Sequence, residues 1–276
     1  MFGKRKDAIK VKNVHGTTNI LIDFKPRRSD GEVYMNVKVD VTEFVKFMDD
    51  LKKKNADLTY FHGMAFIMAK TLYSRPYLNR FVANRTLYMH NDVKLAFVAK
   101  SEFKDDASEY LTVVDIKEDS RLEDISQIIK EKVNKIRNDN HEGGANDASE
   151  MVGHLPKFLR VLTVGILKWV DKHGWLPQSI IDGNIYYSSC ILSNIGTFKT
   201  GAIYHNLTNF GTASSLVTFG EIKNEGRKKV MEMGITIDER IADGFYFCKA
   251  LKLMEYMFAN PEVLKQPAGE HVSMPK

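Results

Sequence analysis

Residues 32–54 read EVYMNVKVDVTEFVKFMDDLKKK, and the hydrophobic pattern changes within this stretch. In its first half five apolar residues alternate with polar ones: Val33, Met35, Val37, Val39 and Val41. This period of two predicts a strand that is buried on one face. From Thr42, which we expect to cap a helix, the apolar spacing becomes helical up to about Lys54. The stretch therefore predicts a strand followed directly by a helix.

The same two patterns recur along the chain without regular strand–helix alternation. We expect further strands at about 20–24, 80–89, 93–99, 110–116, 185–192, 214–222 and 228–237. Helices are expected between Thr59 and Pro76, from a capping box at Ser120 to about Asn138, over 156–172 and over 245–259. An exposed loop is expected over 138–150. We predict one α+β domain over 20–261, with an N-terminal arm (1–19) and a loose C-terminal tail (262–276).

Composition narrows the class of protein. The chain has 276 residues, of which 43% are hydrophobic and 27% charged, as is typical of a globular protein. Two cysteines, Cys190 and Cys248, are too few for a disulfide framework, and no apolar signal segment follows the basic N-terminus. We therefore expect a cytoplasmic protein.

Several other classes of function find no support in the sequence. No apolar run reaches the roughly 18–20 residues that cross a bilayer, so a membrane partner is not expected. We find no metal-ligand spacing and no glycine-rich phosphate-binding motif. The net charge of +5 is spread along the chain, which argues against a nucleic-acid partner and suits an anionic ligand such as a phosphorylated cofactor.

The stretch from Pro156 to Lys172 stands out by its composition. Its large apolar residues are Phe158, Leu159, Val161, Leu162, Val164, Ile166, Leu167, Trp169 and Val170. Two interpretations stay open. The stretch is either a helix that lies on a membrane surface or partner, or a helix packed between parts of one oligomer.

Three groups of residues indicate chemistry. The first is VDVTEFV over 39–45 together with RPYLN over 75–79, the second is SNIG over 193–196, and the third is DERIADGF over 238–245. In this order and spacing they resemble the catalytic domain of the dihydrolipoyl acyltransferases of 2-oxo acid dehydrogenase complexes. Chloramphenicol acetyltransferase is a more distant relative in the same superfamily. The resemblance spans about Ile20 to Pro261.

This resemblance implies a chloramphenicol acetyltransferase-like α+β sandwich, in which helices flank a mixed sheet. It implies a homotrimer or a multiple of it, in which coenzyme A and a lipoyl arm enter a channel between two subunits. Coenzyme A is then a substrate, and the site holds no metal. Only the short segment 1–19 precedes the core, so we expect no lipoyl group of the chain's own. The acyl donor is then a lipoyl-bearing partner protein or a free thioester.

The resemblance also assigns roles to single residues. Ser193 matches the family's serine or threonine that hydrogen-bonds the tetrahedral oxyanion, a role in which a hydroxyl donor stabilises developing negative charge. Asp243 matches the aspartate that holds the active-site loop, often through a salt bridge to an arginine. The remaining substrate-binding positions are expected at Asn194, Gly196, His205 and Gly244.

The family's catalytic histidine, which takes the proton from the attacking thiol, is replaced by Glu239. With ordinary pKa values near 8.5 for a thiol, 6.5 for histidine and 4.3 for glutamate, proton transfer is uphill by about 2.7 kcal/mol to histidine and by about 5.7 kcal/mol to glutamate. Burial of a glutamate recovers part of this difference, and a salt bridge recovers none. His205 and His62 are alternative bases, of which His205 is the better placed.

The sequence therefore leaves two functions open. The first is a stand-alone acyltransferase with Ser193 as oxyanion donor and Glu239 in the general-base position. The second is a catalytically silent relative, in which Glu239 is a salt-bridged structural residue. Such a pseudoenzyme would act as an oligomeric scaffold or would bind coenzyme A or a partner.

Overall fold

The computed structural model describes residues 5–100, 109–139 and 150–274. The described strands are β1 (Ala8–Lys10), β2 (Glu32–Asp40), β3 (Arg80–Ala83), β4 (Thr86–His90), β5 (Val93–Lys100), β6 (Glu109–Ile116), β7 (Cys190–Asn194), β8 (Ser215–Glu225) and β9 (Lys228–Asp238). The described α-helices are α1 (Gly16–Phe24), α2 (Thr42–Lys54), α3 (Tyr60–Ser74), α4 (Leu122–Asp139), α6 (Lys157–Lys172), α7 (Gln178–Ile181) and α8 (Gly244–Ala259).

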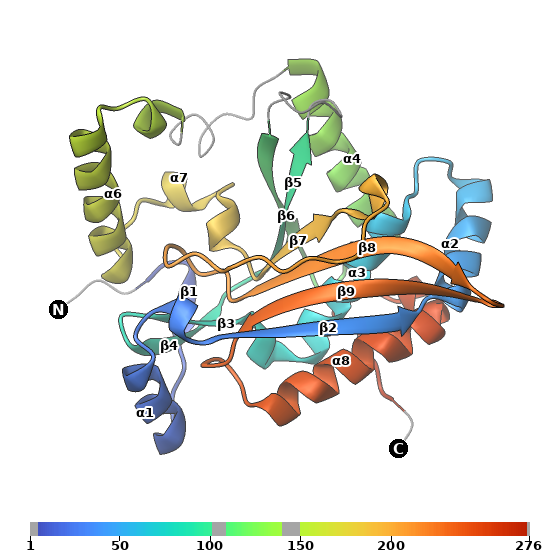
Figure 1. The fold of residues 1–276 in the computed structure, drawn as a ribbon, viewed down its shortest axis with the longest axis horizontal. Coiled ribbons are helices and arrows are strands. Elements are labelled where there is room, and N and C mark those ends of the chain that lie inside the picture. The colour runs from blue at the N-terminus through green and yellow to red at the C-terminus, as the bar shows by residue number, and fades with distance from the viewer. Residues whose placement is uncertain (1–4, 101–108, 140–149, 275–276) are drawn as a thin grey trace.

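The main sheet has six strands in the order β2-β9-β8-β7-β5-β6 (Figure 1). The pairs β5–β7 and β7–β8 are parallel, and the other neighbouring strands are antiparallel, so the sheet is mixed. A smaller antiparallel sheet has the order β1-β4-β3. The α+β class with a mixed sheet flanked by helices is thus confirmed.

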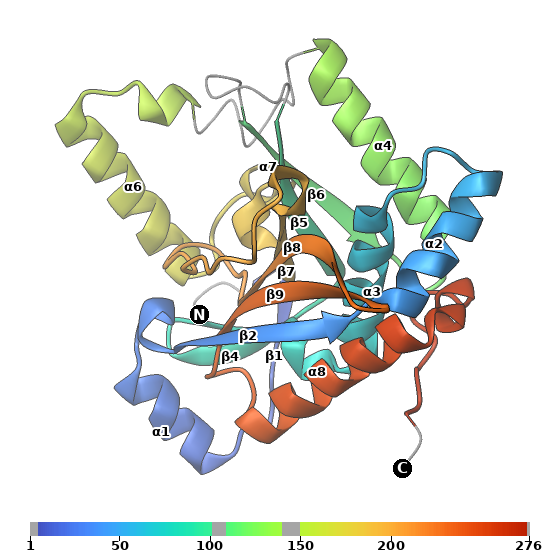
Figure 2. The ribbon, with the colours of Figure 1, turned by 45° about the vertical axis from the view of Figure 1, so that its right-hand side comes forward.

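Helices α2, α3, α4 and α8 cover one face of the main sheet and enclose the core (Figure 2). Each contributes buried apolar side chains, among them Phe44, Phe66, Ile125 and Phe258. The burial of Val39 and the partial burial of alternate residues before it confirm the predicted one-sided strand. Helix α3 is buried on nearly all sides, as its uniformly apolar sequence predicts.

Two expected strands form other structures. Residues 20–24 belong to helix α1, which buries only Ile22 in the core, and a short apolar run does not distinguish helix from strand by period alone. The expected strand over 80–89 is instead the β3–β4 hairpin. Its turn, Asn84 and Arg85, has positive φ at both positions (46° and 56°), as a type I′ turn requires.

Other boundaries also differ from expectation. The region 185–192 divides into a 3₁₀ turn (Ile185–Tyr187) and β7, because the Ser188 hydroxyl bonds the Ile185 carbonyl and turns the chain. Helix α4 begins at Leu122 without the expected box, since the Ser120 hydroxyl accepts from Lys117. Most of the expected 138–150 loop lies outside the described residues.

The two ends of the chain are more ordered than their sequences indicate. Strand β1 adds residues of the N-terminal arm to the small sheet by pairing with β4. The C-terminal tail, expected to be loose, packs against the core through Leu264, Ala268 and Val272, each no more than 5% exposed. The ammonium group of Lys70 in α3 donates to the Pro267 carbonyl at 2.6 Å and fixes the tail there.

Buried His62 makes stability depend on pH. Its Nδ1 accepts from the backbone N–H of Thr59 at 3.3 Å and lies 2.8 Å from the Ser126 hydroxyl. Burial lowers the pKa of His62 to about 4 from an ordinary 6.5. At a pH between these two values, the unfolded chain binds a proton at His62 that the folded chain does not bind. We therefore expect His62 to lower the free energy of unfolding by about 3 kcal/mol as the pH drops from 6.5 to 4.

Urea denaturation across this pH range measures the effect. His62→Gln, whose side chain does not titrate, should remove about half of the slope between pH 6.5 and 4.5, where carboxylates contribute least, because His90, whose pKa burial also lowers to about 4, keeps its own share. The matched control His154→Gln changes an exposed histidine and should retain the slope. An unchanged slope in His62→Gln would contradict the role of His62.

Candidate functional site

The segment between β9 and α8 begins at a buried ion pair. The carboxylate of Asp238 accepts from Nε and Nη2 of Arg240 at 2.7 and 2.6 Å, and neither side chain is more than 1% exposed. Arg240 also donates from Nη1 to the carbonyl oxygen of Lys25 at 2.9 Å. The backbone N–H of Glu239 donates to the carbonyl of Gly31 at 2.8 Å. These bonds tie the end of β9 to the segment between α1 and β2.

Glu239 forms an ion pair with the ammonium group of Lys25. Both side chains are about one-third exposed, at 32% and 35%. Neighbouring Arg240 is directed to Asp238 instead. The Glu239 carboxylate therefore already has a cationic partner within one protomer. Nothing in the local sequence identifies Lys25 as the partner.

Asp243 caps helix α8. Its side-chain oxygen accepts from the backbone N–H of Tyr246 at 2.8 Å, and the helix begins at Gly244. Among the described residues no arginine lies within ion-pair distance of Asp243, so the salt bridge implied by the family is not formed within one protomer. Asp243 therefore has a structural role as a helix cap, not as an ion-pair partner. Arg240, the arginine of this segment, pairs with Asp238.

Ser193 and Asn194 lie on β7, in the middle of the sheet. Ser193 pairs with Thr218 of the parallel neighbouring strand β8. The Ser193 hydroxyl forms no hydrogen bond with another described group. Gly196 follows after Ile195, and a Cβ there would lie 2.5 Å from the carbonyl oxygen of Gly220. The glycine of the SNIG segment is therefore required by the close approach of β8.

The segment 201–207 crosses the sheet on the face that carries Ser193. A Cβ at Gly234 of β9, which lies opposite Thr218, would meet the carbonyl oxygen of Ile203 at 2.3 Å. The segment ends where the backbone N–H of Leu207 donates to the carboxylate of Glu32 at 2.7 Å. His205 therefore reaches the outer sheet face, as its place after the SNIG segment suggests. His62 lies on the opposite, helix-covered side of the sheet.

Three buried polar groups in this region have no hydrogen-bond partner in the described part of the chain. They are Nε2 of His205 and the hydroxyl groups of Thr218 and Thr236. By strand register Thr218 and Thr236 share the face of Ser193. Buried polar groups are normally hydrogen-bonded, so these three groups are exceptions, and they lie on the face that carries Ser193. The alternating pattern of β8 and β9 indicates the face, but the crossing segment that buries it cannot be read from sequence.

Ser193 and Glu239 do not meet within one protomer. Ser193 lies opposite Thr218, and Thr218 lies opposite Gly234, which precedes Glu239 by five residues. With strands about 4.8 Å apart and about 3.3 Å per residue, the two are separated by about 10 Å across the sheet and about 16 Å along it. A site that brings both groups to one substrate therefore needs a second copy of the chain.

No group of three or more histidine, cysteine, aspartate or glutamate side chains is arranged to hold a metal ion in the described ranges. None of the helices in those ranges combines the length and hydropathy needed to cross a bilayer.

No protein-family model matches the sequence, and no curated protein matches it. Solved structures do match. The truncated catalytic core of the 2-oxoacid dehydrogenase multienzyme complex from Thermoplasma acidophilum has a TM-score of 0.59 and 17% identity, covering 92% of this chain and 99% of its own. A chloramphenicol acetyltransferase has a TM-score of 0.52 and 12% identity, covering 91% and 99%.

A third match is the dihydrolipoamide acetyltransferase of Azotobacter vinelandii, for which the catalytic roles of a serine, a histidine and an asparagine were investigated. Its TM-score is 0.61 at 14% identity, covering 92% of this chain and 94% of its own. The chain therefore has the chloramphenicol acetyltransferase-like fold. It shares this fold with the catalytic cores of dihydrolipoamide acyltransferases.

The helix cap at Asp243 is testable. We expect Asp243→Ala to lower the free energy of unfolding by about 1 kcal/mol, because α8 loses its N-cap. Asp243→Asn keeps a side-chain oxygen that can accept the capping bond, so it should change the free energy of unfolding by only a few tenths of a kcal/mol. Urea denaturation followed by circular dichroism measures both, with Asp50→Ala on the exposed face of α2 as control. Equal losses for alanine and asparagine would rule out capping.

Proposed function

We propose that the chain is an acyltransferase that moves an acyl group between coenzyme A and a thiol, amine or hydroxyl acceptor. The observation that carries the proposal is the fold, which matches acyltransferase catalytic cores over more than nine-tenths of the chain. In the A. vinelandii enzyme the investigated histidine precedes the asparagine by four residues. Glu239 and Asp243 have the same spacing.

In this proposal Ser193 stabilises the transition state. Its hydroxyl donates to the oxygen of the acyl carbonyl as negative charge develops there, which contributes about 3 kcal/mol in comparable oxyanion sites. The Ser193 hydroxyl forms no hydrogen bond with another described group. It lies on the sheet face where the Thr218 hydroxyl and Nε2 of His205 also have no hydrogen-bond partner among the described groups. Glu239 of a second copy supplies the carboxylate across the interface.

A glutamate in the base position favours an amine acceptor. A thiol or hydroxyl must lose its proton to become a strong nucleophile, and a carboxylate is by nature a weaker base for that step than a histidine. A neutral amine attacks the thioester carbon directly. The new C–N bond forms, the C–S bond breaks, coenzyme A leaves as the thiolate, and the proton of the acidic ammonium adduct passes to the Glu239 carboxylate.

The second candidate is a catalytically silent protein that binds coenzyme A or a partner. It is favoured by the same Lys25–Glu239 ion pair, because that contact explains Glu239 as a structural residue. The acyltransferase would turn over acyl-coenzyme A, and the silent protein would not. Both candidates are compatible with binding of coenzyme A.

Thiol release from a panel of acyl-coenzyme A species, with amine, thiol and hydroxyl acceptors in separate reactions, distinguishes the two. We expect turnover with the amine, lowered by about 100-fold or more in Glu239→Gln, which removes the base, and by a similar factor in Ser193→Ala, which removes the oxyanion donor. Glu225→Gln, which neutralises an exposed carboxylate at the end of β8, should leave the rate unchanged.

No release with any donor and acceptor, alongside retained calorimetric binding of coenzyme A, would favour the silent protein. Turnover that survives both substitutions would also reject the proposed site.

We further propose that the chain assembles as a homotrimer or a multiple of it. Helix α6 supports this, because it presents its apolar side to solvent in one protomer. Phe158, Val161, Leu162, Ile166 and Trp169 are each at least 53% exposed. Monomeric proteins rarely expose a continuous apolar patch of this kind. The matched T. acidophilum protein is itself the core of a multienzyme complex.

Light scattering at micromolar concentration measures the assembly. We expect the mass of three protomers or a multiple, and a smaller mass for Leu162→Glu/Trp169→Glu, which puts charge into the apolar face. Lys157→Glu, at the start of the same helix, serves as control. A monomeric wild type would reject both the assembly and the shared site. A monomer that sediments with lipid vesicles would instead support the membrane-surface interpretation of α6.

A further inference from the structure

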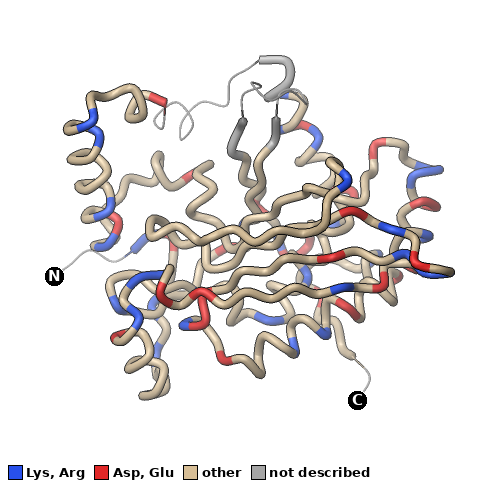
Figure 3. Tube along the Cα trace, in the orientation of Figure 1, with Lys and Arg blue, Asp and Glu red and all other residues tan. Residues whose placement is uncertain are grey.

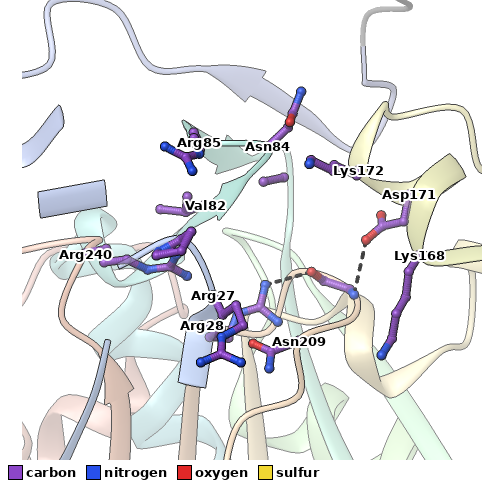
Figure 4. Close-up of a pocket in the computed structure, with 13 residues that line it drawn as sticks. Arg27, Arg28, Val82, Asn84, Arg85, Lys168, Asp171, Lys172, Asn209 and Arg240 are labelled. Carbon is purple, nitrogen blue, oxygen red and sulfur yellow. Dashed lines mark hydrogen bonds between the residues drawn. The ribbon is translucent and has the colours of Figure 1, made fainter. Parts of the chain in front are cut away.

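A basic pocket of about 340 Å³ lies between the segment before β2, the β3–β4 hairpin and the last turns of α6 (Figure 4). Six of its lining residues are cationic: Arg27, Arg28, Arg85, Lys168, Lys172 and Arg240. Asp171 is the one carboxylate among the lining residues. Figure 3 shows basic positions of α6 and of the segment before β2 on the same side of the molecule. A pocket of this volume fits a small molecule.

Half of these cations form ion pairs within the chain: Arg27–Asp30, Arg85–Asp23 and Arg240–Asp238. Asp171 shares Arg5 with Asp7, so its negative charge is only partly balanced. For Arg28, Lys168 and Lys172, no carboxylate of the described ranges lies within ion-pair distance. The pocket therefore carries three cations without a direct ion-pair partner against one partly balanced carboxylate, which leaves a net positive charge.

Arg28 is the most unusual of the three, because it is only 5% exposed. Its guanidinium donates to backbone carbonyls alone, including that of Gly211 at 2.7 Å and that of Phe210 at 3.3 Å. Its Nε is buried and has no hydrogen-bond partner among the described groups. A buried charge without a direct ion pair is costly. The carboxylates of Asp238 and Asp171 attract Arg28 from beyond ion-pair distance, and an anion in the pocket would reduce the cost further. Burial also lowers the pKa of Arg28.

Lys168 and Lys172 complete the site from α6. They are four residues apart, so they lie on the same side of the helix. Both side chains are exposed and free to turn towards a ligand. Figure 4 shows them opposite Arg85 and beside Asp171, whose carboxylate accepts from the backbone N–H of Gly211 at 3.3 Å. That bond fixes the loop whose carbonyl groups hold Arg28.

We propose that this pocket binds the phosphate or diphosphate group of a small phosphorylated ligand, with Lys168 and Lys172 as direct contacts and Arg28 as a fixed positive charge beneath. A phosphate monoester carries about two negative charges at neutral pH, which suits the net positive charge of this pocket. Charge-assisted hydrogen bonds from such groups to phosphate are strong. Coenzyme A and a free phosphorylated metabolite share this chemistry. The proposal does not depend on acyl transfer.

Calorimetric titration of the full chain with pyrophosphate, coenzyme A and dephospho-coenzyme A tests the pocket. The test variant is Lys168→Gln/Lys172→Gln, which changes only exposed side chains. The matched control, Lys157→Gln/Lys46→Gln, removes the same charge from exposed positions outside the pocket. We expect pyrophosphate to bind the wild type, about tenfold or more weaker to the test variant, and nearly unchanged to the control. Arg28→Gln should weaken binding as well.

The ligands separate the two sources of phosphate. If the test variant weakens coenzyme A but not dephospho-coenzyme A, the pocket holds the 3′-phosphate, and if it weakens both, it holds the diphosphate. If only pyrophosphate is affected, the ligand is a free phosphorylated metabolite. Absence of pyrophosphate binding to the wild type, or equal weakening in test variant and control, would overturn the proposal. None of these readouts requires turnover, so they are independent of the acyltransferase assay.

Discussion

The buried ion pair between Asp238 and Arg240 is the interaction on which the candidate site depends. Two charges that are almost completely removed from water are stable only when they are paired and hydrogen-bonded. Because Arg240 also bonds the carbonyl of Lys25, the end of β9 and the segment before β2 are fixed to each other. This geometry brings the Lys25 ammonium to Glu239 and directs the chain into α8. It also places Arg240 in the wall of the basic pocket.

Elements with a sustained hydrophobic period could be predicted from the sequence. The strand and helix of residues 32–54 appear as expected, because each period extends over several residues and reports burial on one side. Short elements could not be predicted in the same way. Helix α1 buries one residue, Ile22, and the β3–β4 turn uses Asn84 and Arg85 without the glycine that normally marks a hairpin.

The candidate site was predictable only in part. The segments at 193–196 and 238–245 could be identified from the sequence because their residues follow a recognisable local pattern. In the structure they lie at the ends of β7 and β9. Lys25 was missed, because its contact with Glu239 joins residues far apart in the chain. The cations of the basic pocket come from four separate segments, so no local charge cluster marks them. Such pairings are set by the tertiary fold, and a single sequence does not record them.

The pairing of β2 with β9 also determines when the fold can form. These strands lie far apart in the sequence, and among the described strands β9 is the only neighbour of β2 in the main sheet. During synthesis β2 leaves the ribosome early and has no hydrogen-bonding neighbour in that sheet until most of the chain has been translated. Its open edge is then available to other extended chains. The order of synthesis therefore leaves this strand edge open until β9 has been made.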